Sequence, residues 1–183
     1  MKIIFITLVL LISTSPCFAV EYISSNGKNH IFGIDLGLGS IDPENFEEEL
    51  DTESIVRLTY GYQYNSTWSI NTGLIFGNGT ELCIVTCPEL RTLSYTSYIL
   101  NIKGSHPLNN RWSVFGKLGV NYYDLELSGA NQANVTDNGI GPLIATGFDF
   151  RAYNGFGLGI ELSLQDMAVI TSTGVSFNFS YMF

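Results

Sequence analysis

Large apolar residues recur at every second position along most of this chain. The clearest case is residues 172–183, in which the alternate apolar residues are Val175, Phe177, Phe179, Tyr181 and Phe183. A two-residue period is that of a β-strand with one apolar face. In a water-soluble domain this aromatic terminal strand would be an aggregation-prone edge. We therefore expect lipid to cover its apolar face and the first strand of the chain to pair with its free edge.

The same alternation predicts further strands, giving eight in total. They are residues 28–40, 54–64, 68–77, 91–103, 112–124, 139–151 and 156–165. The first half of residues 91–103 is ambiguous because Thr92, Ser94 and Thr96 occupy the otherwise apolar row, and a β-bulge would shift the register there. Pro142 cannot donate a ladder hydrogen bond, so we expect it near the rim of the sheet.

Composition indicates which face of these strands meets lipid. Only 14% of the residues are charged, whereas 13% are aromatic and 19 are glycine. A water-soluble barrel needs frequent charges on its outer row. The polar row here is mainly Gly, Ser, Asn and Thr, which fit the narrow lumen of a small barrel. We therefore predict an all-β fold, an eight-stranded antiparallel up-and-down transmembrane β-barrel whose apolar row faces the hydrocarbon.

The predicted connections alternate between short and long. Residues 65–66, 105–110 and 153–155 are turn candidates, and residues 41–53, 78–90 and 126–138 have the composition of long loops. Short turns and both termini belong on the periplasmic side of such a barrel. Strand order then predicts an aromatic girdle at that boundary. Its members are Phe32, Tyr62, Tyr64, Trp68, Trp112, Phe150, Phe156, Tyr181 and Phe183.

The N-terminal segment has the layout of a cleaved secretory signal. Lys2 precedes an apolar run at residues 3–12, and a short polar stretch ends at Ala19. That run is about half the ~20 residues that a membrane-spanning helix needs. We predict a signal peptide at residues 1–19 and one barrel domain at residues 20–183. Acylation of Cys17 is the alternative, although residues 14–16 lack the usual lipoprotein pattern.

Cys83 and Cys87 are the cysteines that would remain after this cleavage. An even number in an oxidising compartment favours a disulfide that closes a small loop. The alternative, half of a metal site, lacks two further Cys or His ligands nearby. We expect no metal and no cofactor.

Four stretches resemble the OmpA-like family of outer-membrane β-barrels: KLGVNYY at 117–123, GIGPLIATGFDF at 139–150, GIEL at 159–162 and VSFNFSYMF at 175–183. The resemblance implies a barrel in the outer membrane of a Gram-negative bacterium, in contact with lipid and lipopolysaccharide. The terminal row of Phe179, Tyr181 and Phe183 resembles the signal read by the barrel-assembly machinery. Because the chain stops at Phe183, we do not expect the peptidoglycan-binding domain of that family or its anchoring role.

Charged residues of the polar row would lie in the lumen. The predicted ion-pair cluster consists of Asp35, Arg57, Lys117, Asp149, Arg151 and Glu161, with Lys103 in the same row. Charges in a narrow lumen are costly unless they are paired. In the resembled family such a network plugs or gates the lumen, and Glu161 lies in the matching motif. Arg57, Lys117 and Glu161 are therefore a candidate gate, and a filled core with satisfied charges is the alternative.

Two other features carry weaker hypotheses. The acidic run at residues 42–53 could bind divalent cations or a basic host surface, but it lacks the spacing of a calcium loop and also fits a solvated surface loop. Acyl chemistry, as in barrel enzymes that modify lipid A, needs a serine, a histidine and an acid within reach. His30 precedes the first strand and His106 lies in a predicted periplasmic turn. We therefore expect no enzymatic activity.

Together these patterns predict a small, monomeric outer-membrane barrel that contributes to envelope structure. Its loops at residues 41–53, 78–90 and 126–138 would face the outside. The leading function is adhesin-like surface recognition, with host surface molecules as candidate partners and no nucleic-acid partner. The alternative is a narrow, porin-like diffusion pore.

Overall fold

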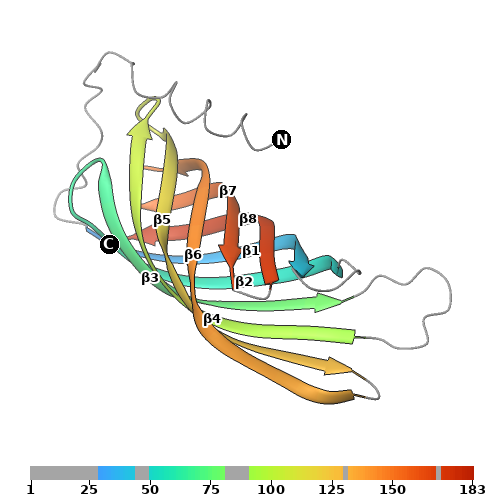
Figure 1. The fold of residues 1–183 in the computed structure, drawn as a ribbon. Coiled ribbons are helices and arrows are strands. Elements are labelled where there is room, and N and C mark those ends of the chain that lie inside the picture. The colour runs from blue at the N-terminus through green and yellow to red at the C-terminus, as the bar shows by residue number, and fades with distance from the viewer. Residues whose placement is uncertain (1–28, 44–49, 81–90, 130–131, 168–169) are drawn as a thin grey trace, which may run out of the picture.

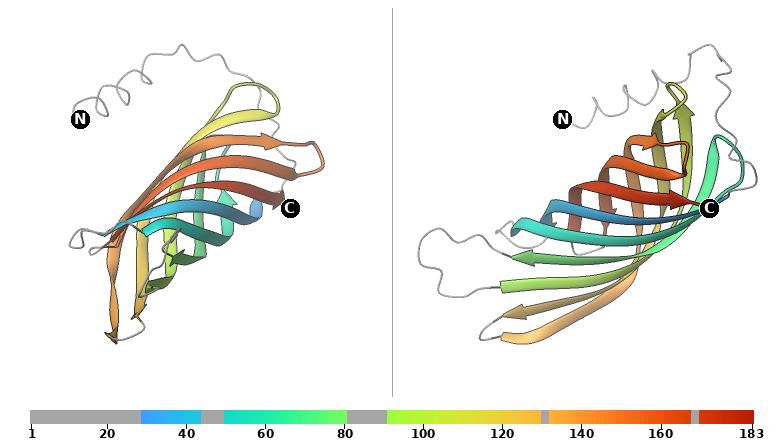
Figure 2. Two further views of the ribbon diagram at one scale, coloured as in Figure 1. Left: turned by 90° about the vertical axis from the view of Figure 1, so that its right-hand side faces the viewer. Right: turned by 180° about the vertical axis from the view of Figure 1, so that it is seen from behind.

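The computed structural model describes residues 29–43, 50–80, 91–129, 132–167 and 170–183. These residues form one closed antiparallel barrel, so the predicted fold class is confirmed (Figures 1 and 2). Its strands are β1 (His30–Pro43), β2 (Leu50–Gln63), β3 (Trp68–Thr80), β4 (Arg91–Pro107), β5 (Trp112–Gly129), β6 (Gln132–Arg151), β7 (Phe156–Asp166) and β8 (Ile170–Met182). Within the described ranges, no helix is long and apolar enough to cross a membrane.

The terminal strand pairs with the first strand, as predicted. The β1–β8 ladder runs from Ile31 opposite Met182 to Pro43 opposite Ile170. At its periplasmic end, the Phe183 N–H donates to the His30 carbonyl at 2.9 Å, and the His30 N–H donates back to the Phe183 carbonyl at 3.1 Å. Closure removes the two sheet edges that would otherwise expose unpaired backbone groups to lipid.

Side chains alternate between lumen and exterior along each strand. Asp35 and Glu161 are at most 1% exposed, whereas the outward-facing Leu38 and Leu118 are each 66% exposed. On the side away from the short turns, the outward row changes from apolar to polar on every strand. The polar residues there are Ser40, Ser54, Asn78, Thr96, Asp124, Asn138, Asp166 and Thr173. This ring marks the outer boundary of the lipid-facing band.

Strand β5 gives the height of that band. Its outward residues are apolar from Trp112 to Tyr122, with Gly116 among them, and Asp124 follows. At about 3.3 Å per residue this length is about 33 Å along the strand, and a tilt of about 40° reduces it to about 25 Å along the membrane normal. That height is the usual height of the apolar band of an outer-membrane barrel.

Short turns lie together at the periplasmic end, and in each of the three an asparagine side-chain oxygen accepts from backbone N–H groups. The Asn65 side-chain oxygen accepts from the Thr67 and Trp68 backbone N–H groups at 2.9 and 2.8 Å. Asn109 accepts in the same way from Arg111 and Trp112. In the third turn Gly155 has φ of 93°, a conformation that suits glycine.

The predicted aromatic girdle gathers at this end. Tyr64, Trp68 and Phe183 are 80%, 53% and 52% exposed, and the other girdle residues also face outward. Phe150 is half-buried because its ring lies 5.2 Å from that of Trp112.

The prediction of a long loop at residues 126–138 is wrong. β5 continues to Gly129 and β6 begins at Gln132, and the two strands pair along this whole length. Similarly, residues 41–43, 50–53 and 78–80 belong to strands. These segments lie beyond the lipid band, where the outward face of a strand can be polar. Their composition therefore resembles that of a loop although their backbones are paired.

The predicted ambiguity in β4 is resolved without a bulge. Its register with β3 is continuous from Thr92 to Gly104, so Ser94 and Thr96 face outward. The register shifts instead at Gly39/Ile41 and Leu127/Gly129.

The outer part of the barrel wall is uneven. β4, β5 and β6 have 17, 18 and 20 residues, whereas β7 has 11. β6 pairs with β7 only from Leu143 onward, next to Pro142, which has no N–H to donate. Pro142 thus lies at the end of the β6–β7 ladder and not at the outermost rim. Figure 1 shows β4, β5 and β6 running past the ends of β7 and β8 as a projecting wall.

Several predictions concern residues outside the described ranges. They are the signal peptide at residues 1–19, the alternative acylation of Cys17, the Cys83–Cys87 disulfide and residues 44–49 of the acidic run.

Candidate functional site

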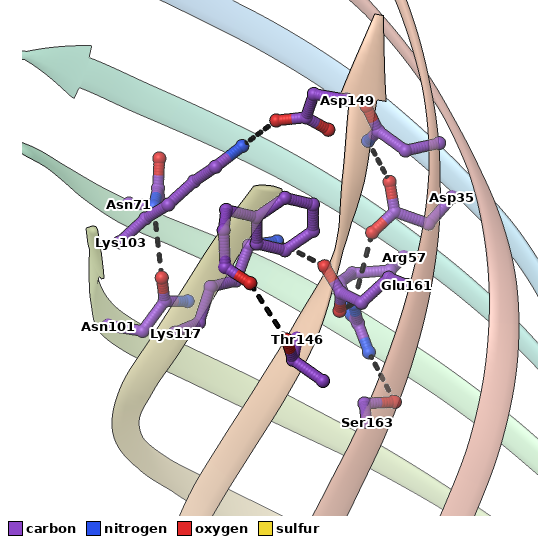
Figure 3. Close-up of polar contacts among 12 residues, drawn as sticks. Asp35, Arg57, Asn71, Asn101, Lys103, Lys117, Thr146, Asp149, Glu161 and Ser163 are labelled. Carbon is purple, nitrogen blue, oxygen red and sulfur yellow. Dashed lines mark hydrogen bonds and ion pairs between the residues drawn. The ribbon is translucent and has the colours of Figure 1, made fainter. Parts of the chain in front are cut away.

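The periplasmic half of the lumen holds a network of buried charges. It is built from inward positions on six strands: Asp35 on β1, Arg57 on β2, Lys103 on β4, Lys117 on β5, Asp149 on β6 and Glu161 on β7. Cross-strand register brings some of them face to face, since Asp35 lies opposite Arg57 and Lys103 lies opposite Lys117. The alternation of the strands therefore delivers these side chains to the same half of the lumen (Figure 3).

Glu161 is the centre of this network. Its Oε1 atom accepts a hydrogen bond from Arg57, and its Oε2 atom lies 2.5 Å from the Lys117 ammonium. Arg57 also reaches the Asp35 carboxylate at 3.1 Å, and Asn178 donates to the same acid. The structure thus brings together Asp35, Arg57, Lys117 and Glu161, four of the predicted cluster residues. Mutual pairing offsets the large cost of removing these charges from water.

A second pair lies nearer the periplasmic mouth. Lys103 forms an ion pair with Asp149, a carboxylate that is 8% exposed. Lys103 and Lys117 are like charges directly across the β4–β5 ladder, which is unfavourable. The Phe115 ring reduces this repulsion because its face lies 4.1 Å from the Lys103 ammonium and 5.3 Å from that of Lys117.

Arg151 differs from the rest of the predicted cluster. It faces the lumen at the end of β6, but it makes no ion pair with any described residue. Its Nη1 atom is buried, and no atom in the described ranges forms a hydrogen bond with it. The prediction that Arg151 shares in the ion-pair network is therefore wrong, because each nearby acid already contacts another cation.

The outer half of the lumen is filled mainly by apolar side chains, contrary to the predicted row of small polar residues. Its buried side chains are Ile41, Ile55, Ile75, Leu93, Tyr95, Ile99, Tyr123, Leu125, Leu143, Met167 and Ile170. Ile75 lies directly opposite Arg57, so this apolar layer begins where the charged layer ends. Each of these residues is at most 4% exposed. The side chains pack together across the barrel above the ion pairs.

A buried acid that the sequence prediction placed in a loop lies among these residues. Glu53 is 0% exposed; Tyr95 donates a hydrogen bond to its Oε1 atom, and Ser172 donates to its Oε2 atom at 2.6 Å. The sequence could have identified Glu53 as an inward-facing residue of β2, because it stands two and four residues before Ile55 and Arg57 and so shares their face of the strand. Gly77 lies opposite Tyr95 and leaves room for the Tyr95 ring.

The outward face of the projecting wall carries a hollow of about 340 Å³. Adjacent outward positions of β3 to β6 line it, including Phe76, Thr96, Asp124, Glu126 and Thr136. It begins at the polar ring that ends the lipid band, so it lies on the extracellular side. Both acids on β5 are exposed.

The predicted assembly-signal residues and the histidines lie near the periplasmic boundary. Phe179, Tyr181 and Phe183 face outward and are 45%, 48% and 52% exposed. The His30 Nδ1 atom lies 2.6 Å from the Tyr60 hydroxyl, and its ring stacks on Phe183 at 5.8 Å. Among the described residues, no group of three or more His, Cys, Asp or Glu side chains is arranged to hold a metal ion.

Solved structures of several outer-membrane proteins share this fold. Ail, the attachment invasion locus protein of Yersinia pestis, is 12% identical with a TM-score of 0.60, and the match covers 85% of this chain and 99% of Ail. OprG of Pseudomonas aeruginosa is 16% identical with a TM-score of 0.61, over 85% of this chain and 97% of OprG. Neisserial surface protein A is 9% identical with a TM-score of 0.65, and the match covers 84% of this chain and 97% of that protein.

At these identities the similarity demonstrates the fold alone. A comparison with curated protein sequences finds no match. The resemblance to outer-membrane β-barrels is nevertheless confirmed by a family model that matches residues 5–183, nearly the whole chain. The protein is therefore a small outer-membrane β-barrel, and it belongs to the family described as the outer membrane protein beta-barrel domain.

Proposed function

We propose that this barrel serves in adhesin-like surface recognition as well as in envelope structure, and that its projecting wall is the recognition surface. The observation that carries the proposal is the hollow of about 340 Å³ on the outward face of β3 to β6. It lies beyond the lipid-facing band and is lined by polar and acidic side chains beside Phe76. A concave surface with an aromatic wall and several polar groups has the features of a binding site.

Charge favours a basic partner for this surface. Asp124 and Glu126 lie side by side in the outward row of β5, and the chain as a whole has a formal net charge of −9. Ail has been solved in complex with the heparin analogue sucrose octasulfate, a polyanion. A polyanion would be repelled by the acidic hollow of the present chain. The ligand class proposed here is therefore a cationic segment of a host surface molecule.

The alternative function, a narrow diffusion pore, rests on the polar periplasmic half of the lumen. That half contains cavities of about 40 Å³ and 20 Å³. The apolar layer above it favours the recognition proposal, because ions would have to cross side chains that are at most 4% exposed. A role for Arg57, Lys117 and Glu161 as a gate belongs to the pore alternative.

Binding to charged surfaces tests the recognition proposal. The protein in neutral-lipid nanodiscs is passed over immobilised poly-lysine and, in parallel, over immobilised heparin. We expect saturable binding to poly-lysine that weakens strongly in the variant Asp124→Asn/Glu126→Gln. Asp42→Asn is the matched control because Asp42 is an exposed acid on β1, on the opposite side of the barrel. Stronger binding to heparin, or equal loss in the control, would overturn the proposal.

Conductance in planar bilayers tests the alternative. We expect no channel openings from the wild-type protein. If Arg57, Lys117 and Glu161 form a gate, Glu161→Ala will conduct, and unchanged conductance in that variant removes the gate hypothesis.

The absence of enzymatic activity remains part of the proposal. His30 supports it, since its ring contacts Tyr60 and Phe183 at the periplasmic boundary and no described carboxylate bonds to it. Incubation of the pure protein with lipid A tests it, and release of an acyl chain would contradict it.

A further inference from the structure

The periplasmic half of the lumen contains two small cavities that adjoin the same charged side chains. The larger, of about 40 Å³, lies between Lys103, Lys117 and Arg151. The smaller, of about 20 Å³, lies nearer the mouth and is also lined by Lys103 and Arg151. A space of this kind exceeds the ~10–15 Å³ that a water molecule requires. Each cavity can therefore hold a particle of the size of water or somewhat larger.

The side chains around these cavities carry an excess of positive charge. Lys103, Lys117 and Arg151 line the cavities together with Asp149 and Glu161. Arg57 and Asp35 are linked to this set by ion pairs through Glu161, so the whole network has four positive and three negative charges. Glu53 is separate because its hydrogen bonds go to Tyr95 and Ser172 in the outer half. The described lumen at this level thus has a net charge of +1.

All three acids are already engaged. Asp35 contacts Arg57 and Asn178, Glu161 contacts Arg57 and Lys117, and Asp149 contacts Lys103. Lys103 is in addition repelled by the charges of Lys117 and Arg151. Arg151 is the cation that remains without an ion pair in the described part of the chain.

Arg151 lines both cavities and has one donor without a partner among the described residues. The Arg151 side chain lies beside Gly157, its cross-strand partner on β7, with its guanidinium carbon 3.7 Å from where a Gly157 Cβ would be. Its Nη1 atom is buried without a hydrogen-bond partner among the described residues. A buried guanidinium donor without an acceptor is unfavourable by more than an ordinary hydrogen bond is worth. An acceptor in the adjoining cavity would remove that penalty.

We propose that the cavity between Lys103 and Arg151 binds a small monovalent anion, with chloride as the representative ligand. Lysine and guanidinium groups have donors and no acceptors, so they suit an anion better than a water molecule, which must also donate. Charge-assisted hydrogen bonds from both groups hold the anion, and its charge neutralises the lumen. The Phe115 ring, 4.1 Å from the Lys103 ammonium, forms an apolar wall on one side.

Access to this site is from the periplasmic side. The smaller cavity is lined by residues of the periplasmic end, including Gln63, Thr67 and Ser105. The apolar layer from Ile55 to Leu143 covers the site on the outer side. The inferred site is therefore a blind, positively charged pocket of the periplasmic mouth, independent of the recognition surface on the projecting wall.

Chloride-35 NMR relaxation tests this inference. The protein is purified from membranes in an uncharged detergent, and chloride is titrated against gluconate at constant ionic strength, because gluconate is too large for the cavity. We expect saturable broadening of the chloride resonance. Arg151→Gln should raise the chloride dissociation constant about tenfold or more, since one charge-assisted hydrogen bond is lost. Arg151→Lys should restore much of the affinity because it keeps the charge.

Arg111→Gln is the matched control. Arg111 belongs to the same end of the barrel, but it is exposed and its guanidinium lies 4.9 Å from the centre of the Tyr153 ring, outside the lumen. Its removal should leave the titration unchanged. Heat-modifiable migration in gels confirms that each variant is a folded barrel. Broadening that does not saturate, that persists in Arg151→Gln, or that falls equally in Arg111→Gln would overturn the inference.

Discussion

Neutralising Glu161 is the sharpest test of the lumen network. Glu161→Gln keeps the size and shape of the side chain and removes one negative charge that two cations share. The Glu161, Arg57 and Lys117 side chains are 1%, 3% and 10% exposed, so little water can replace the lost charge. Arg57 keeps Asp35 at 3.1 Å. Lys117 keeps the Phe115 ring, whose centre lies 5.3 Å from its ammonium, but loses the carboxylate with which it is paired.

Removing one partner of a buried ion pair commonly costs about 3–5 kcal/mol, because the other charge stays buried without compensation. We expect Glu161→Gln to lower the free energy of unfolding by that amount. Most of the loss should come from Lys117, since Arg57 retains a carboxylate. The double variant Glu161→Gln/Lys117→Gln should therefore be more stable than Glu161→Gln alone, which makes the coupling between the two sites measurable by a double-mutant cycle.

Urea unfolding in an uncharged detergent, followed by tryptophan fluorescence, measures these changes. Glu126→Gln is the control for removal of an acid at an exposed position, and we expect it to stay within about 0.5 kcal/mol of wild type. The reasoning is refuted if Glu161→Gln loses less than about 1 kcal/mol, or if the second substitution brings no recovery, since the pair would then be worth no more than a solvent-exposed one.

Three further predictions test the outer lumen, the lipid face and the terminal strand. Gly77→Ala should destabilise the barrel in the same urea assay, because the added Cβ would overlap the Tyr95 ring and disturb the hydrogen bond from Tyr95 to Glu53. Gly116→Ala is the control and should be tolerated, because its Cβ would have its nearest contact at 4.0 Å. Leu118→Arg, at a 66% exposed position in the middle of the lipid band, should cost about 2–4 kcal/mol in refolding into lipid bilayers, and a neutral result would argue against that band. Deletion of Phe183 should reduce the amount of inserted protein in cells more than it reduces stability in detergent, and equal effects would argue against its role as an assembly signal.

The sequence by itself determined the strand number, the lipid face and the closure of the barrel. A strand has a period of two, and a barrel in lipid places all its apolar residues on one side, so alternation and a low content of charge are sufficient. The polar row also identified the lumen charges, because Asp35, Arg57, Lys117 and Glu161 occupy alternate positions of their strands. Strand order then placed the short turns and the aromatic residues at one end.

The tertiary structure decided which of those charges meet and how far the strands extend. Pairing depends on how the closed barrel brings non-adjacent strands together: Lys103 on β4 meets Asp149 on β6, whereas Arg151 makes no ion pair with any described residue. Beyond the lipid band the outward residues, such as Glu126 and Thr136, are polar. The sequence there resembles that of a loop, although the backbones are paired and inward residues such as Leu125 stay buried. The apolar layer of the outer lumen could not be predicted from the sequence, for a related reason. Its members, such as Ile75 and Leu143, are spread singly over many strands, and only the closed barrel packs them together.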